Sequence, residues 1–149
     1  MSTQEIYNEL LPLVALDLQE IVSNTTTPGN IIDTLNADKG VIIGLQSGVL
    51  TDGVFVPLFE ESDDSAFATS NEIADINIVP VKIGTTWYKT GQEVASQFIL
   101  TDDNVIRNFG FIGTKRYIRA SVVSTGVTSG GFFSGISFEK GNTQSVYGL

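Results

Sequence analysis

Short runs of β-branched and aromatic residues, separated by clusters of turn-forming residues, recur along the chain at intervals of roughly 8–15 residues. No part of the chain shows an equally strong helical period of 3.6 residues. Strands at this spacing are typical of a sandwich or barrel rather than of alternating βαβ units. We therefore expect an all-β fold, a single antiparallel β-sandwich of jelly-roll or immunoglobulin-like type.

One turn signal predicts how two of these strands are connected. Asp52-Gly53 lies between the apolar runs 40–50 and 54–61 and predicts a β-hairpin, because glycine adopts positive φ at little cost. Pro57 within the second run cannot donate a ladder hydrogen bond, so we expect an edge or a bulge there. Further strands are expected at 11–23, 31–35, 76–83 with a break at Pro80, 97–100, 105–112, 115–123 and, after a last hairpin turn at 125–131, at 132–138.

The N-terminal end of the chain is ambiguous. Ile6 and Leu10 fit one stripe of a short helix, but Pro12 would interrupt that helix. We expect residues 1–10 to form a short arm or helix that docks on a partner. No internal repeat and no low-complexity linker divides the remaining residues, so we expect residues 11–149 to form one sandwich domain.

The chain contains neither cysteine nor histidine, which excludes much of enzyme chemistry. There is no thiolate nucleophile, no disulfide, no imidazole ligand for a metal and no Ser-His-Asp triad. Seventeen acidic residues make some carboxylate pair inevitable, so such a pair is weak support for a glycosidase. We expect no catalytic site, no cofactor and no metal site, and therefore not an enzyme.

The charge balance limits the partners that the chain can have. Seventeen acidic residues against eight basic ones give a net charge of −9, which argues against binding to a nucleic-acid backbone. The sequence has no basic, apolar leader and no run of about 18 apolar residues, so neither secretion nor a membrane is expected. The acids are concentrated in residues 1–81, with 13 acids and one base, against four acids and seven bases in 82–149. This asymmetry is either a chance drift or a pair of complementary patches that orient neighbouring molecules.

Three small constellations have both a functional and an ordinary interpretation. The acidic run Glu60–Asp64 is either a cation-binding loop or ordinary polar loop chemistry at a strand end. The run Asp102-Asp103-Asn104 is likewise either a cation-binding corner or an ordinary Asx turn. The pair Trp87-Tyr88 is either a stacking platform for a sugar or a half-buried aromatic pair at the rim of a sandwich.

Residues 115–119, with the sequence KRYIR, form the one basic cluster. Strand alternation places Lys115, Tyr117 and Arg119 on one face and Arg116 on the other, so at least one arginine faces the core or a partner. Such an arginine either pairs with a loop carboxylate, for example in 60–64, and ties that loop to the sheet, or contributes to an interface.

Three segments carry a resemblance to a known family. They are 50–64 (LTDGVFVPLFEESDD), 111–119 (FIGTKRYIR) and 125–131 (TGVTSGG). Together with the strand pattern, they resemble small structural proteins of tailed bacteriophages whose genes usually lie near the major capsid gene. The likeness covers most of residues 11–141. Residues 66–97 and the N-terminal arm depart from it, and we expect these parts to set partner specificity.

The resemblance implies a virion component, a capsid decoration or cement protein that binds and stabilises the major capsid protein lattice. Its location would be the capsid surface after assembly in the host cytoplasm, and we expect homo-oligomers on the virion. Two alternatives stay open, a head–tail connector, neck or tail adaptor protein, and a carbohydrate-binding or host-adhesion module on the virion that uses Trp87 and Tyr88. The residues expected to form contacts are Ile6, Tyr7, Leu10, Arg116, Tyr117 and Arg119.

Overall fold

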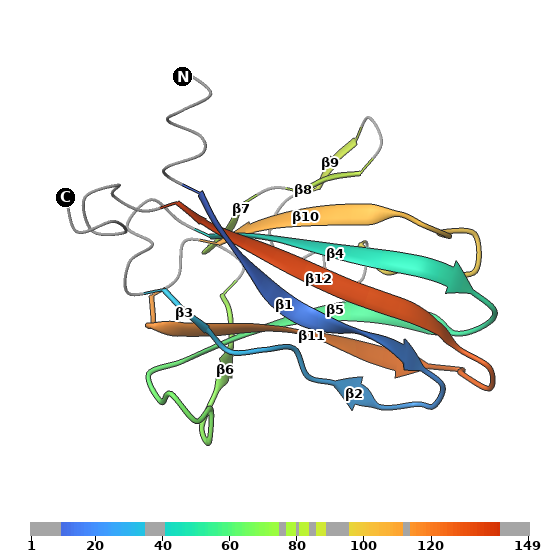
Figure 1. The fold of residues 1–149 in the computed structure, drawn as a ribbon, viewed down its shortest axis with the longest axis horizontal. Coiled ribbons are helices and arrows are strands. Elements are labelled where there is room, and N and C mark those ends of the chain that lie inside the picture. Colours follow the sequence, from blue (N-terminus) through green and yellow to red (C-terminus); the bar gives the residue numbers. More distant parts are fainter. Residues whose placement is uncertain are drawn as a thin grey trace.

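The computed structural model of the chain describes residues 10–34, 41–74, 77–79, 81–83, 86–88, 96–111 and 114–140. None of the described residues forms an α-helix, and the regular elements among them are β-strands (Figure 1). Within these ranges there is accordingly no helix long and apolar enough to cross a membrane. The strands are β1 (Leu10–Ile21), β2 (Thr26–Thr27), β3 (Ile32–Asp33), β4 (Val41–Leu50), β5 (Val54–Ser62), β6 (Asn71–Glu72), β7 (Ile78–Val79), β8 (Val81–Ile83), β9 (Thr86–Tyr88), β10 (Ile106–Phe111), β11 (Tyr117–Thr125) and β12 (Gly131–Lys140).

The strands form two antiparallel sheets that lie face to face (Figure 1). Sheet A has the strand order β1-β12-β4-β10-β7, and sheet B has the order β2-β11-β5-β6, with β3 also paired to β11. Strands β8 and β9 make a small separate ribbon. The prediction of an all-β antiparallel sandwich is therefore confirmed.

The pairing of the strands is nested along the chain. The first strand, β1, pairs with the last, β12, while β2 and β3 pair with β11, β4 pairs with β10, and β5 pairs with β6. Consequently the long strands β4, β5, β10, β11 and β12 alternate between sheet A and sheet B. This is the strand order of a jelly roll, one of the two sandwich types expected.

Both predicted hairpins are wrong, although their strands lie close to where they were expected. Strand β4 belongs to sheet A and β5 to sheet B, so Asp52-Gly53 is a corner between the two sheets. Strand β11 belongs to sheet B and β12 to sheet A, so the turn between them is also a corner between the two sheets and not a hairpin. Gly53 has a φ of 94°, but Asp52 is not among the residues of positive φ. A two-residue type I′ hairpin needs positive φ at both central residues, so the backbone turns out of the sheet instead.

The aromatic core explains why β5 leaves the sheet that contains β4. Phe55 and Phe59, on the inner face of β5, are fully buried. Phe55 packs on Phe133 of β12 with ring centroids 4.7 Å apart, and Phe59 packs on Phe109 of β10 at 4.6 Å. Because β10 and β12 are strands of sheet A, burial of these rings places β5 across the core from them.

Two prolines occupy positions that sheet geometry tolerates. Pro12 lies on β1, an edge strand of sheet A. On β5, the N–H and C=O of Phe55 bond to Phe98 rather than to β11, and alternation turns the backbone of Pro57 the same way. Among the described residues, β6 pairs with β5 only at Glu60 and Glu61, so Pro57 lies at an edge, as predicted.

The segment around Phe98 differs from the expectation of a strand at 97–100. Phe98 makes a single bridge to Phe55, and the chain then turns. Its N–H donates to the Phe55 carbonyl at 2.8 Å, and its ring lies 5.3 Å from that of Phe133. The Phe98 side chain therefore fills one end of the core, and its segment does not add a further strand to a sheet. By contrast, the strand expected at 11–23 is confirmed as β1.

Candidate interaction surfaces

The basic cluster 115–119 is tied by acidic residues from other segments. Arg119 Nη2 lies 2.9 Å from Glu60 Oε1, across the ladder between β11 and β5. The same guanidinium stacks on Phe67 at 4.5 Å from the ring centroid, which fixes the loop after β5 against sheet B. Lys115 makes a longer ion pair of 3.9 Å with Asp63. Of the two alternatives given for such an arginine, Arg119 shows the pairing with a carboxylate of 60–64, although Glu60 belongs to strand β5 and not to a loop.

The electrostatics of Glu60 follow from this arrangement. Burial alone would raise the pKa of the Glu60 carboxyl, but hydrogen bonds from Arg119 and Ser70, together with the Arg119 charge, outweigh burial and lower it. The carboxylate is therefore the favoured form in the folded protein.

Arg116 lies outside the strand alternation used in the prediction, because β11 begins at Tyr117. Its guanidinium makes two hydrogen bonds of 2.9 Å to the two carboxylate oxygens of Asp33 and stacks beside the Tyr117 ring. Hydrogen bonding to Asp33 raises the Arg116 pKa. Both side chains of the pair remain 46% exposed, so the pair lies at the surface and not in the core.

The other predicted contact residues are placed only in part. Ile6 and Tyr7 lie outside the described residues. Leu10 begins β1 and pairs with Lys140, but its side chain is outside the described part of the structure. The same is true of the side chains of Trp87 and Tyr88 on β9.

The acidic run 60–64 sends its carboxylates in different directions. Glu61 is buried and binds Thr114 through its backbone N–H and its hydroxyl, the latter at 2.8 Å. Asp64 accepts hydrogen bonds of 2.9 Å from the backbone N–H groups of Ala66 and Ala68. In the described part of the chain, no three His, Cys, Asp or Glu side chains converge on a position that could hold a metal ion.

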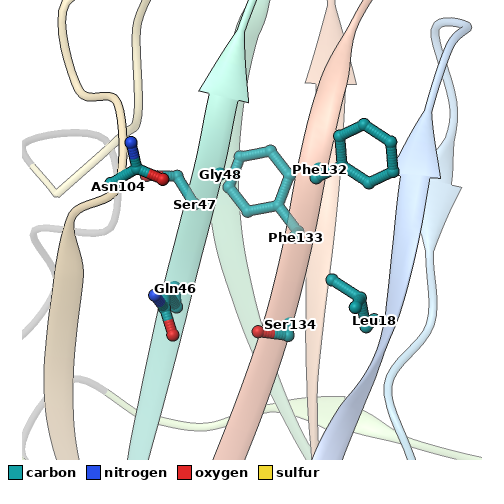
Figure 2. Close-up of a pocket in the computed structure, with 8 residues that line it drawn as sticks. All are labelled: Leu18, Gln46, Ser47, Gly48, Asn104, Phe132, Phe133 and Ser134. Atoms are coloured by element: carbon teal, nitrogen blue, oxygen red, sulfur yellow. The ribbon is translucent and has the colours of Figure 1, made fainter.

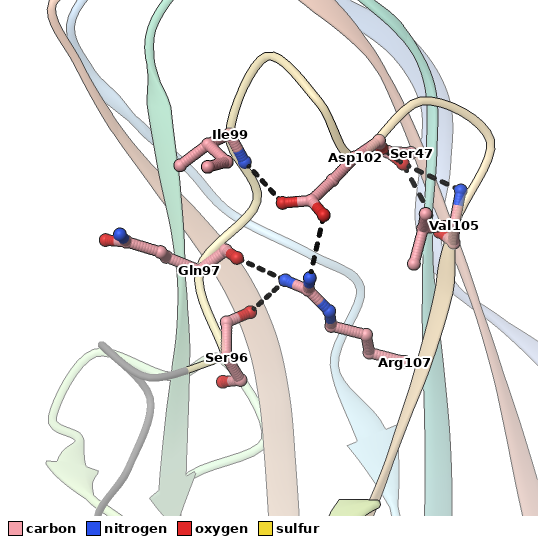
Figure 3. Close-up of polar contacts among 7 residues, drawn as sticks. All are labelled: Ser47, Ser96, Gln97, Ile99, Asp102, Val105 and Arg107. Carbon is pink, nitrogen blue, oxygen red and sulfur yellow. Dashed lines mark hydrogen bonds and ion pairs between the residues drawn. The ribbon is translucent and has the colours of Figure 1, made fainter. Parts of the chain in front are cut away.

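Arg107 is a buried arginine that the sequence analysis did not single out. Its contacts within the chain give it a structural role. It is 7% exposed, and its guanidinium stacks on Phe98 at 4.4 Å. It donates hydrogen bonds to the carbonyls of Ser96 and Gln97 and pairs with Asp102 at 3.2 Å (Figure 3). The alternation of side chains along β10 could have predicted that Arg107 is buried, because Arg107 lies on the same face of the strand as the buried Phe109 and Phe111.

The carboxylates at the 102–104 corner bind backbone N–H groups of other residues and not the N–H two residues ahead, so these bonds are not those of the Asx turn given as the ordinary alternative. Asp102 accepts from the backbone N–H of Ile99 at 2.8 Å (Figure 3), and Asp103 accepts from that of Leu50 at 2.7 Å. These carboxylates therefore close turns and support the end of β4.

The outer face of sheet A is the most unusual surface among the described residues. We call it the apolar face, defined by seven large apolar side chains that are each 39–75% exposed. Its members are Val14, Leu18, Ile42, Ile106, Phe132, Ile136 and Phe138. The outward positions between them on β4, β10 and β12 carry Gly, Ser, Asn or Gln and no charged residue.

The members of the apolar face are neighbours across the strands. Val14 is the register partner of Ile136, and Ile42 is the register partner of Phe138. Gly44 lies opposite Ile136, and a Cβ built on it would come within 2.9 Å of the Asn108 amide oxygen and meet the Ile106 side chain at 3.4 Å. The glycine therefore leaves room for the Asn108 side chain, which lies with Ile106 on the outer face of β10.

A shallow hollow of about 260 Å³ opens at one end of this face (Figure 2). Leu18 and Phe132 stand on one side, and Gln46, Ser134 and Asn104 supply polar groups around it. Gly48 contributes to the depth, because its missing side chain would meet the Phe132 Cβ at 3.0 Å. No titratable side chain lines the hollow, so nothing there can act as a general acid or base.

Comparisons of the chain with protein-family models, with curated proteins and with solved structures found no match.

Proposed function

We propose that this chain is a structural component of a tailed-bacteriophage virion, a decoration protein that binds and stabilises the lattice of the major capsid protein. It acts by surface contact and makes or breaks no covalent bond. It assembles in the host cytoplasm and lies on the capsid surface, where many copies bind a repeating lattice and their individually weak contacts add through avidity.

The observation that carries this proposal is how the side-chain chemistry is distributed. Within the described residues, Glu60 and Asp63 of the first family-like segment pair with Arg119 and Lys115 of the second, while an uncharged sheet face is left open to solvent. In this part of the chain the side chains offer surfaces for contact. That is the arrangement expected of an assembly protein.

The segments that resemble phage structural proteins also meet in space, which supports the resemblance. Asp52, in the first segment, accepts hydrogen bonds from the backbone N–H groups of Thr128, Ser129 and Gly130, in the third. Glu60, in the first segment, pairs with Arg119, in the second. These residues connect the two sheets at one corner and brace sheet B, so the likeness concerns the scaffold of the fold.

Arg116 and Tyr117 are our candidates for the capsid contact among the described residues. The half-exposed Arg116 guanidinium, stacked by Tyr117, can exchange its bond to Asp33 for a carboxylate or carbonyl of the capsid protein. Arg119 is more enclosed and serves mainly to hold Phe67 and Glu60. Ile6, Tyr7 and Leu10 complete the proposed contact set.

The test is titration of the purified protein into undecorated capsids, with the bound copies counted per particle. We expect saturable binding at hundreds of copies, because decoration follows the lattice. Saturation at about six or twelve copies would instead identify a ring at the neck or tail, since such rings follow the symmetry of a portal vertex. No binding at any salt concentration would refute the proposal.

Variants sharpen this experiment. Arg116→Ala combined with Tyr117→Ala is expected to weaken capsid binding by about tenfold or more, because Arg and Tyr are enriched among interface hot spots. Leu100→Ala is the control, since Leu100 is exposed but lies on the separate loop before β10. Equal binding by all three proteins would remove Arg116 and Tyr117 from the contact.

A further inference from the structure

We propose that the apolar face is covered by a second copy of this chain, so that two molecules pack the outer faces of their A sheets together about a two-fold axis. In such an isologous interface each copy presents the same residues to the other. This inference goes beyond the virion role, because it concerns the state of the free protein in solution.

The size of the face fits such a partner. If a fully exposed large apolar residue offers about 200 Å², seven residues that are exposed by about half leave on the order of 700 Å² of apolar surface. The largest apolar patch on a typical monomer measures about 300–600 Å². A standard interface buries about 800 Å² on each partner, so an apolar surface of this size would make up most of what one partner contributes.

The composition of the face points to a copy of the same chain rather than to a partner recognised by charge. Homodimer interfaces are more apolar than other interfaces, and their centres are depleted of charged residues. The outward positions of β4 and β10, and those of β12 from Phe132 to Phe138, show this depletion, although β1 carries the exposed Asp17 and Glu20 and the chain as a whole has a net charge of −9. Because each molecule is negatively charged, two copies repel each other. This repulsion is weakest where the facing surfaces carry few charged side chains.

The shape of the face also suits self-packing. Leu18 is 75% exposed and stands beside the hollow, which has Gly48 and Ser134 in its lining (Figure 2). A two-fold axis gives each copy both a projecting apolar side chain and a hollow to receive one. Glu20, the register partner of Phe132, places a carboxylate at the rim of the face, where water still reaches it in the dimer.

The test is analytical ultracentrifugation of the full chain across a range of concentrations. We expect a dimer, and we expect Ile136→Asp to weaken the association by about 100-fold or more, because the two-fold axis buries two uncompensated carboxylates. Ile31→Asp is the matched control. It makes the same change at a residue that is 39% exposed, against 48% for Ile136, but lies beside β3 on the sheet B side, and it should leave the dimer intact. Circular dichroism and thermal unfolding verify that both variants fold.

Each outcome decides the inference. A wild-type protein that stays monomeric up to about 1 mM, or a dimer that Ile136→Asp does not weaken, overturns it. A monomer whose capsid binding is lost in Ile136→Asp overturns it too, since the capsid protein is then the occupant, while the decoration role stands. A dimer sensitive to Ile136→Asp that binds no capsid supports the inference and refutes the decoration role.

Discussion

Arg119 on β11 and Glu60 on β5 stand opposite each other in the ladder of sheet B, and their side chains meet at 2.9 Å. Both side chains are largely enclosed, with 22% and 17% exposed, whereas those of the pair Arg116–Asp33 are each 46% exposed. The two ion pairs have the same N–O distance but differ in burial and in hydrogen bonding, since Arg116 makes two bonds to Asp33 and Arg119 makes one to Glu60. Burial and bond number favour opposite pairs, so a comparison shows which of the two matters more.

We expect Arg119→Met to reduce the free energy of unfolding by about 1–3 kcal/mol, because it leaves the partly buried Glu60 carboxylate without its main partner. Arg116→Met should change it by no more than about 1 kcal/mol, as is usual for exposed pairs. Urea unfolding of both variants measures the difference. Equal losses would mean that burial does not set the strength of these pairs.

The corner formed by Asp52 gives a prediction about acid sensitivity. Hydrogen bonds from the Thr128 hydroxyl and from the backbone N–H groups of residues 128–130 lower the pKa of Asp52 from 3.8 to about 2. Because the folded-state pKa is lower, the corner adds stability above pH 3.8 and loses it as the pH falls toward 2.

We therefore expect Asp52→Asn to lower the thermal unfolding temperature at pH 6 and to have progressively less effect as the pH falls below 3.8. Thermal unfolding of the wild type and the variant over a pH series measures this. A difference that is the same at all pH values would show that the Asp52 charge is unimportant to the corner.

The pKa of Glu139 is shifted in the opposite direction to that of Asp52. It faces inward on β12 and is 4% exposed, and its Oε1 has no hydrogen-bond partner among the described residues. Burial, together with the negative charge of Asp33, raises its pKa above 4.5. The folded protein therefore binds this proton more tightly than the unfolded chain does, and the associated stability is present below pH 4.5 and is lost as the pH rises through the folded-state pKa.

We expect Glu139→Gln to stabilise the protein at pH 7, since the neutral amide has nearly the same shape and removes a buried charge. The gain should shrink when the urea unfolding of both proteins is repeated at successively lower pH, because the raised pKa favours the neutral form of Glu139 in the folded protein. A variant that is less stable than the wild type at pH 7 would show that the carboxylate has a partner that matters more than its desolvation.

Arg107 anchors the segment 96–103, so its loss should release that segment. We expect Arg107→Met to cost about 3 kcal/mol, because it removes the partner of Asp102 and the hydrogen bonds to two carbonyls. Amide hydrogen exchange is the discriminating measurement. The amide of Ile99, bonded to Asp102, should lose protection more than that of Ile43 in the centre of sheet A.

Strand positions were predictable here because they depend on local patterns. The alternation in β11 and the position of Pro57 on an edge both follow from side-chain period and proline chemistry. The crossing at Asp52-Gly53 was not predictable in the same way, because a turn signal does not say which sheet the next strand joins. That choice depends on Phe55 and Phe59 finding Phe133 and Phe109, which are distant in the sequence.

The candidate surfaces were predictable only in part. Charge suggested the pairing of Arg119 with a carboxylate of 60–64 as one of two alternatives, but it did not show that Glu60 lies on the neighbouring strand β5. The apolar face was missed, although adjacent apolar residues such as Ile42-Ile43 and Phe132-Phe133 contained the signal for strands that are apolar on both sides. Alternation assigns one member of each pair to the core and leaves the other outside.

The nested pairing of strands also governs how the protein is made. Leu10 is the register partner of Lys140, so the ladder between β1 and β12 cannot form until the ribosome has synthesised almost all of the described chain. Until β12 arrives, β1 and β4 in sheet A lack the strand that joins them. We therefore expect the sandwich to close only after β12 has been synthesised, and chains truncated before Gly131 to expose strand edges on β1 and β4 that invite aggregation.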